Sequence, residues 1–228
     1  MNYSISDIIF WSEVNIDHLE FLLADINDNH LGIKTKLEEH KEAFIKLINN
    51  PDDEYYIYRN IKIHSAYIND INDIKINDNY IYQNNLYTIK HMINEGFSFY
   101  SILLVLEQDK TPIPILENIK IHESLLPSTL DHLHMIKEID NVDPAKVNYF
   151  YRKYLALERL QNKIYLHYSQ FGRLNPIKRL NIKLIKASVQ LLNFYENLKH
   201  DNKIITHIIK EEKYYLDLLY RFKKSFRK

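Results

Sequence analysis

The stretch His91-Met-Ile-Asn-Glu95 has a counterpart near the end of the chain, His207-Ile-Ile-Lys-Glu211, 116 positions later. Both run from His-x-x-x-Glu into aromatic residues and then leucines, as HMINEGFSFYSILLVL and HIIKEEKYYLDLLYRF. A second pair, Asp17-His18-Leu19 and Asp131-His132-Leu133, is 114 positions apart. These two unlike motifs each recur after nearly the same number of residues, which indicates a tandem duplication. We therefore expect two half-chains, each opening with an acid-His helix and closing with a His-x-x-x-Glu helix.

The composition favours helices and excludes several kinds of site. The 228 residues include only 3 Gly and 6 Pro, too few turn formers for a fold with many strands. No GxGxxG or GxxxxGK[ST] phosphate loop is present. Cys is absent, which excludes disulfides and thiolate metal ligands and fits a reducing compartment. Any metal site must therefore form without thiolate ligands.

Charge and hydropathy argue against two classes of partner. Lys+Arg and Asp+Glu each number 30, so there is no net charge to attract nucleic acid or an anionic membrane. Residues 1–14 lack the basic segment of a secretory signal, and no apolar run approaches the ~20 residues of a membrane-spanning helix. We expect a cytoplasmic protein with neither a membrane nor a nucleic-acid partner.

Apolar residues at three- and four-residue steps predict eight helices. Their ranges are 6–27, 33–49, 53–76, 80–108, 115–140, 144–171, 176–199 and 202–224. Pro112 and Pro114 make residues 108–114 the linker between the halves. Short connections make neighbouring helices antiparallel. The predicted fold is all-α, with two tandem up-down four-helix bundles, 1–110 and 115–228, whose apolar faces we expect to pack together.

The fourth predicted helix, residues 80–108, illustrates how the interior faces are assigned. Ile93, Phe97 and Tyr100 belong to its unbroken apolar stripe, and His91 and Glu95 run along the flank of that face. In the other helices that carry the repeated motifs, the histidines fall within the apolar arc. The repeated polar residues are therefore expected at or near the core.

The repeated residues have the chemistry of a metal site. Side chains four apart lie on one helix face, so a His-x-x-x-Glu pair aims an imidazole and a carboxylate at one point. If the first and last helices of a bundle are neighbours, the acid-His helix adds a second imidazole. Two His and one carboxylate with open positions suit Fe(II), Mn(II) or Zn(II). The six candidate ligands are His18, His91, Glu95, His132, His207 and Glu211.

Other interpretations stay open. The histidines can be core residues of a metal-free helical interaction module, and the basic end RFKKSFRK, residues 221–228, can complement a helix dipole or contact nucleic acid. Asp17 and Asp131 can orient an imidazole rather than bind a metal. His40 and Glu158 also fall on inward faces and are additional candidate ligands. The sequence leaves open whether each half holds one ion or the halves share one. The histidines treated as ordinary are His64, His122, His134, His167 and His200.

Four segments resemble a known family. FWSEVNIDHLEFLLADI and LPSTLDHLHMIKEIDNVDP resemble the openings of the two repeats of the bacterial ferritin-like proteins called Bacillus cereus metalloprotein-like, and the two His-x-x-x-Glu segments resemble their closing helices. The resemblance implies two tandem ferritin-like four-helix bundles that bind metal through the six candidate ligands. This chain departs from the family pattern at Asp17, Gly96, Pro127 and Glu212. The family has no assigned reaction.

The resulting expectation is a metal-binding, ferritin-like protein of unknown physiological role. Iron or manganese is favoured over zinc, because a His/carboxylate site suits redox chemistry linked to oxygen or peroxide. The chain lacks the Glu plus two Glu-x-x-His motifs of di-iron carboxylate bundles, so an iron store or a standard di-iron oxidase is not expected. The sequence leaves open whether the protein is an enzyme.

Overall fold

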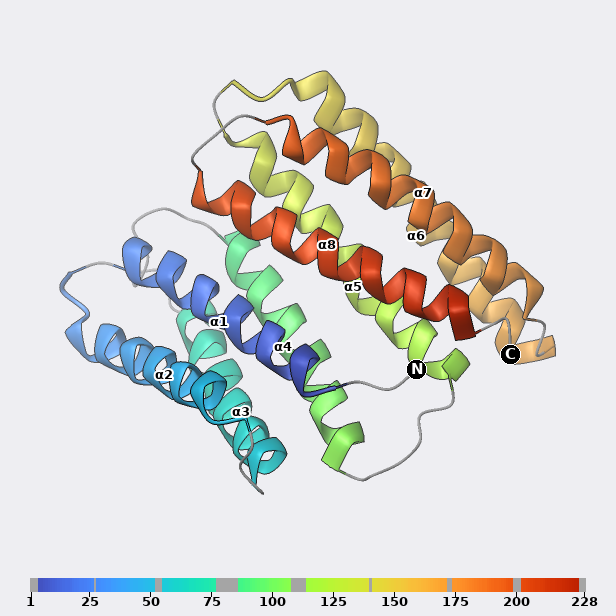
Figure 1. Cartoon of the computed structure of the whole chain (residues 1–228). Coiled ribbons are helices and arrows are strands. Elements are labelled where there is room, and N and C mark those ends of the chain that lie inside the picture. Colours follow the sequence, from blue (N-terminus) through green and yellow to red (C-terminus); the bar gives the residue numbers. More distant parts are fainter. Residues whose placement is uncertain are drawn as a thin grey trace. The chain divides into compact units, whose positions relative to one another are not determined.

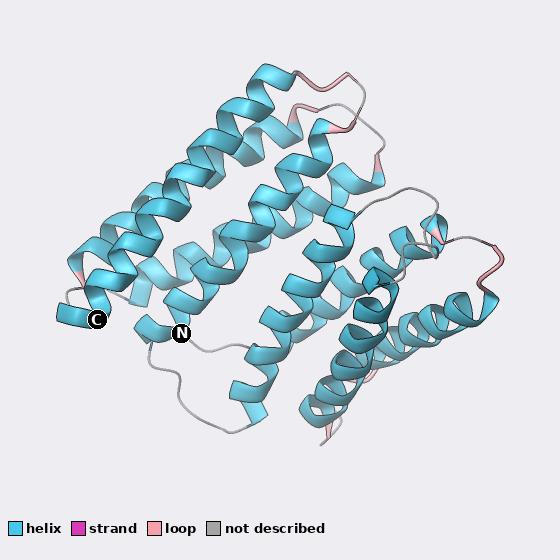
Figure 2. Ribbon diagram, turned by 180° about the vertical axis from the view of Figure 1, so that it is seen from behind, coloured by secondary structure: helices cyan, strands magenta, loops and turns pink. Residues whose placement is uncertain are grey.

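The computed structural model describes residues 4–26, 28–51, 55–76, 86–107, 114–139, 141–171, 174–198 and 202–225. Within these ranges the chain has eight α-helices and no β-strand, which confirms the all-α prediction (Figures 1 and 2). The chain divides into two compact units, Asn2–Pro112 and Ile113–Lys228. No helix in the described ranges combines the length and the apolar character that a membrane span requires.

The first unit contains helices that contact one another in a closed order. They are α1 (Ile5–Asp25), α2 (Leu31–Asn49), α3 (Tyr56–Ile76) and α4 (Leu86–Glu107). α1 packs against α2 and α4, and α3 packs against the same two helices (Figure 1). Because α1 and α4 are neighbours, side chains far apart in the sequence can meet inside this unit.

The second unit has the same order of contacts. Its helices are α5 (Pro114–Lys137), α6 (Pro144–Phe171), α7 (Asn175–Glu196) and α8 (Lys203–Ser225). α5 packs against α6 and α8, and α7 packs against α6 and α8. The helix bounds agree with the predicted ones to within three residues, except for the start of α4, predicted at residue 80. That position and linker residues 108–113 lie outside the described residues.

The start of α1 follows from a local capping arrangement. The backbone N–H of Ser4 donates to Oδ2 of Asp7 at 2.8 Å, and the backbone N–H of Asp7 donates to the Ser4 carbonyl at 3.0 Å. These bonds satisfy N–H groups that have no partner within the helix, and an acid in the first turn also complements the helix dipole. The helix that carries His18 therefore has a well-defined beginning.

The buried face of α4 differs from the predicted stripe. Phe97, expected in the core, is 55% exposed, whereas Met92 and Phe99 are fully buried together with His91. The prediction was wrong for Phe97, whereas Ile93 of the same stripe is buried as predicted. The helix instead turns His91, Glu95 and its glycine inward.

Gly96 allows α3 to lie close to α4 beside the buried polar pair. A Cβ atom at this position would lie 2.9 Å from Cγ1 of Ile68, which is closer than packed atoms tolerate. Ile68 is itself buried and branched at Cβ, so it has little freedom to move away. The absence of a side chain at residue 96 is therefore a packing requirement of the first unit.

The close approach at Gly96 predicts the effect of adding one methyl group. Overpacking costs ~1–3 kcal/mol, and better helix propensity returns ~1 kcal/mol, so Gly96→Ala should lower the free energy of unfolding by about 1 kcal/mol. Gly32→Ala in α2 is the control, because a Cβ there meets nothing within 4 Å and should stabilise the helix. Urea unfolding of both variants measures the difference. Equal stabilisation by both substitutions would contradict the packing argument.

Candidate metal centre

Two helices of the first unit bring three of the candidate ligands together. His18 comes from α1, and His91 and Glu95 come from α4. Val14 and Leu22 lie four residues before and after His18, and both are buried, so helical spacing turns the imidazole inward with them. The three polar side chains are at most 3% exposed. The first half thus contains a buried polar cluster inside an apolar core.

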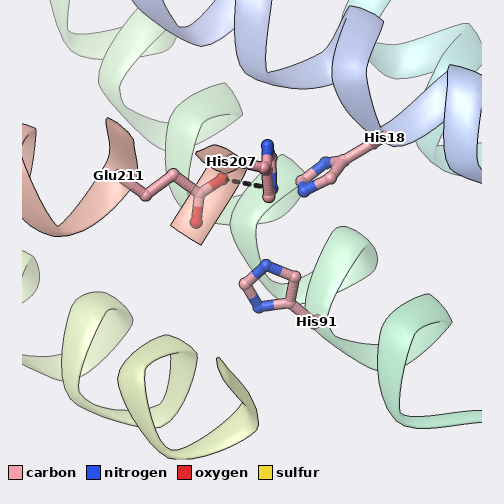
Figure 3. A group of neighbouring side chains, drawn as sticks. All are labelled: His18, His91, His207 and Glu211. Carbon is pink, nitrogen blue, oxygen red and sulfur yellow. Dashed lines mark ion pairs between the residues drawn. The ribbon is translucent and has the colours of Figure 1, made fainter. Parts of the chain in front are cut away.

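The geometry of this first cluster centres on the carboxylate. Oε2 of Glu95 lies 3.4 Å from Nε2 of His91 and 3.7 Å from Nε2 of His18. The two imidazole rings are nearly perpendicular, with centroids 5.4 Å apart, and a nitrogen of one lies within 4.8 Å of a nitrogen of the other (Figure 3). Two imidazoles and one carboxylate oxygen therefore converge on a small volume.

The second unit builds the same set from α5 and α8. Nε2 of His132 lies 2.7 Å from Oε2 of Glu211, and Nε2 of His207 lies 2.9 Å from Oε1 of the same carboxylate. The dashed line in Figure 3 marks the pair formed by His207 and Glu211. The two rings are again nearly perpendicular, at 83°, with centroids 6.5 Å apart. Each oxygen of this carboxylate faces one imidazole nitrogen.

The second cluster keeps its carboxylate ionised although it is buried. Burial by itself raises the pKa of Glu211, but the charges of His207 and then of His132 outweigh it and hold this pKa well below its usual range. Hydrogen bonds from the same two imidazoles act in the same direction. A charged carboxylate between two imidazoles is the form that binds a cation.

Within each cluster, the separations of the donor atoms suit ligands of one metal ion. Two ligands at ~2.0–2.2 Å from one ion lie roughly 2.8–3.6 Å apart at tetrahedral or octahedral angles. The carboxylate–imidazole separations of 3.4 and 3.7 Å in the first cluster, and of 2.7 and 2.9 Å in the second, lie close to this range. Three protein donors would also leave positions open for small ligands. The carboxylate–imidazole separations of both clusters are therefore compatible with metal binding.

The other candidates have different surroundings. Nε2 of His40, on α2, lies 2.8 Å from Oδ2 of Asp70 on α3, a pair that involves neither cluster. Asp17, Asp131 and Glu158 are partly exposed. An orienting role for the two aspartates stays a prediction, and His40 and Glu158 are not brought into the clusters.

Most of the histidines treated as ordinary are not part of a polar cluster. His134 is partly exposed, with its ring centroid 4.8 Å from that of Tyr151, and His167 is exposed. His200 and residues 226–228 of the basic end lie outside the described residues. In the described part of that end, Arg221 pairs with Asp217 at 2.6 Å, as in an ordinary helix-surface pair.

His64 is a buried histidine of a different kind, and its sequence context was not recognised. Nδ2 of Asn15 donates to Nε2 of His64 at 2.7 Å, and the imidazole is fully buried. Burial lowers the pKa of His64 to about 3, so it is neutral. Tyr67, Ile68 and Ile71 follow it at helical spacing and are also buried, which is the signal that could have placed it in the core.

His122 is the corresponding neutral histidine of the second unit. Its Nδ1 lies 2.7 Å from the hydroxyl of Tyr165, and its Nε2 lies 3.4 Å from Oδ1 of Asn181. Burial lowers the pKa of His122 to about 3. Each unit therefore holds one buried neutral histidine with neutral partners, in addition to the two buried histidines that face the glutamate of its cluster.

Glu212 is a second buried carboxylate of this unit, which the sequence analysis did not include among the candidate ligands. It is 2% exposed, and its Oε1 lies 3.6 Å from Nδ1 of His132. The first unit has no equivalent, because Gly96 stands at the matching place after Glu95. Adjacent residues on a helix usually point to different faces. No sequence pattern used above identifies Glu212 as an interior residue.

Comparison with known proteins supports the fold. The chain is similar to an uncharacterized protein from Bacillus cereus G9241, seen in a crystal structure, with a TM-score of 0.84. The match covers 98% of this chain and 94% of that chain at 16% sequence identity, so it concerns the fold alone. No protein-family model matches the chain, and no curated protein matches it. The chemistry of the site must therefore be argued from this chain's own residues.

The two neutral histidines predict a loss of stability in acid. The pKa of each is about 3 in the folded chain and about 6.5 in the unfolded chain. Their contribution to the free energy of unfolding is therefore complete above pH 6.5 and is lost as the pH falls toward 3. At pH 5 each should cost about 2 kcal/mol, because the unfolded chain binds the proton. Urea unfolding at pH 7 and pH 5 measures this loss.

The double variant His64→Gln/His122→Gln isolates the two groups. Glutamine keeps hydrogen-bonding capacity without titrating, so the loss between pH 7 and pH 5 should shrink by about 4 kcal/mol. His167→Gln, at an exposed position of α6, is the control and should leave the loss unchanged. An unchanged loss in the double variant would mean that other groups cause it.

Proposed function

We propose that this chain is a metal-binding protein of the ferritin-like kind, with a transition-metal ion held in each half by two histidines and one glutamate. The observation that carries the proposal is the repeated convergence of two buried imidazoles on one buried carboxylate, in both units. In each unit the set comes from the first and last helices. A single such set is compatible with a core histidine pair, but two equivalent sets favour a shared chemical purpose.

The energetic argument concerns the carboxylates. A buried carboxylate is costly unless it is paired or bound to a metal, and a fold that required only packing would place apolar residues there. Glu95 and Glu211 are 3% and 6% exposed. Metal binding requires both imidazoles to release their protons, and the two neutral imidazoles with one carboxylate then give a site of charge −1, which a divalent ion compensates. Metal binding therefore accounts for the residue types as well as for their positions.

The proposed architecture is two tandem four-helix bundles, residues 1–110 and 115–228. The closed order of helix contacts in each unit supports it, as does the placement of matching ligands on α1 and α5 and on α4 and α8. The similarity of fold to the Bacillus cereus protein is compatible with this architecture. Duplication of one bundle would explain why the ligands recur at nearly one period.

The metal proposed is iron or manganese. When bound with open positions, either ion supplies redox chemistry toward oxygen or peroxide. The chain's own part would be to hold the ion with His18, His91 and Glu95, or with their counterparts in the second half, and to exclude bulk water. One ion per half is proposed because no Glu-x-x-His motif adds the carboxylates of a dinuclear centre.

Metal content tests the proposal directly. Untagged protein purified without chelator should contain iron or manganese at up to two ions per chain by elemental analysis. The double variant His91→Ala/His207→Ala removes one imidazole from each half and should abolish the bound metal. Each single variant should reduce the content by about half, because the other half keeps its ligands.

The matched control is His40→Gln/His134→Gln, which also replaces two histidines but leaves both clusters intact. It should retain the metal content of the parent chain. If the parent chain contains no metal and its melting temperature does not rise with added Fe(II), Mn(II) or Zn(II), the proposal fails. The clusters would then be core polar pairs of a metal-free helical interaction module, and protein partners would be sought instead.

A further inference from the structure

The second cluster has a feature that the first lacks, a carboxylate on the far side of one imidazole. Nε2 of His132 faces Glu211 at 2.7 Å, and Nδ1 of the same ring lies 3.6 Å from Oε1 of Glu212. The two ring nitrogens point in diverging directions, so one ion cannot bind both. Glu212 is therefore placed to act on the imidazole rather than on an ion bound at Nε2.

Glu212 is deeply buried and has spare hydrogen-bonding capacity. Its side chain is 2% exposed, and neither carboxylate oxygen has a hydrogen-bond partner among the described residues. A buried carboxylate in this condition is destabilising unless a function retains it. The 3.6 Å separation from His132 exceeds a hydrogen bond. A small rotation of the glutamate side chain can close it.

Three buried phenols lie near enough to Glu212 for its charge to act on them. Burial raises the pKa values of Tyr154, Tyr195 and Tyr215 well above the usual range, and the charge of Glu212 raises them further. The phenols therefore remain protonated and keep an O–H group that can donate a hydrogen bond. The hydroxyl of Tyr154 contacts Oγ of Ser188 at 3.1 Å, whereas those of Tyr195 and Tyr215 have no hydrogen-bond partner among the described residues. This environment favours a carboxylate that accepts hydrogen bonds.

We propose that Glu212 is a positioning residue of the second-half site, whose carboxylate accepts the Nδ1–H of His132 and leaves Nε2 free to bind the metal. The proposal rests on the proposed function, since it concerns the same ion. A carboxylate on the outer nitrogen fixes the tautomer and orientation of a metal-binding imidazole and increases its basicity. Loss of such a partner typically weakens metal binding 10–100-fold.

The two halves differ at the position that Glu212 occupies. Gly96 stands where Glu212 would be in the first half, and a side chain there would meet Ile68 at 2.9 Å. The first half therefore cannot adopt the same arrangement without repacking α3 against α4. The second half should bind the tighter of the two ions, and the difference should depend on Glu212.

The experiment uses the full chain with His91→Ala, so that the second-half site is measured alone. Co(II) is the probe, and its affinity is measured by competition with a chelator. Glu212→Leu should weaken binding 10–100-fold. Glu212→Gln should weaken it less, because the amide oxygen still accepts the Nδ1–H. The unfolding free energy of the metal-free Leu variant should not fall, since leucine replaces a buried carboxylate that lacks donors.

A spectroscopic readout separates positioning from ligation and from simple packing. In Co(II)-loaded protein, the Nδ1–H proton of His132 gives a shifted resonance. This proton should be protected from solvent exchange when residue 212 is Glu or Gln, and should exchange rapidly with solvent in the Glu212→Leu variant. The Co(II) absorption spectrum should indicate the same coordination number for the parent, the Gln variant and the Leu variant. A lost ligand in the Leu variant would make Glu212 a direct ligand and overturn the proposal.

The remaining outcomes are equally decisive. If the Leu variant binds Co(II) as tightly as its parent, the inference is wrong while the proposed function stands. If the parent with His91→Ala takes up no Co(II), the proposed function fails for this half and the inference fails with it. If Leu weakens binding but also destabilises the metal-free chain to the same extent, Glu212 is a packing residue and the positioning role is excluded.

Discussion

The constraint that shapes each half of this chain is the burial of one carboxylate between two imidazoles. A glutamate that is nearly inaccessible to water must be compensated, and in both units the compensation comes from the first and last helices of the unit. These helices must therefore be neighbours, and their polar residues must face each other. The order of helix contacts and the inward turn of α4 both satisfy this requirement. The apolar core then surrounds a polar centre instead of filling the space completely.

The buried histidines are of two kinds: some are neutral with neutral partners, and others face a carboxylate. Both kinds have polar partners, so several polar groups can be buried. His64 and His122 are neutral and are hydrogen-bonded to amide and phenol groups, so they need no charged partner at neutral pH. His132 and His207 face an ionised carboxylate instead, whose pKa they hold low. The first kind of site favours packing, whereas the second kind has the charge and the geometry to accept a cation.

Helical periodicity predicted the elements, and the repeated His-x-x-x-Glu and Asp-His segments singled out the residues that cluster. The spacing of His91 and Glu95 guarantees a common face, and the repeat supplies the partners, so these contacts follow from local geometry. Phe97 was misplaced because the close approach at Gly96 is a tertiary effect that outweighs hydrophobicity. Glu212 was missed because α8 packs against both α5 and α7, so two adjacent positions are buried at once. A sequence read one helix at a time cannot reveal such a wide buried face.

The central claim is that each half binds an ion at its His–Glu cluster, and anomalous X-ray diffraction from crystals grown with Mn(II) or Fe(II) tests it most directly. The account predicts one anomalous peak in each half, ~2.0–2.2 Å from two imidazole nitrogens and one carboxylate oxygen. In the first half these atoms belong to His18, His91 and Glu95. Peaks confined to exposed carboxylates, with both interior clusters closed on their own hydrogen bonds, would contradict it.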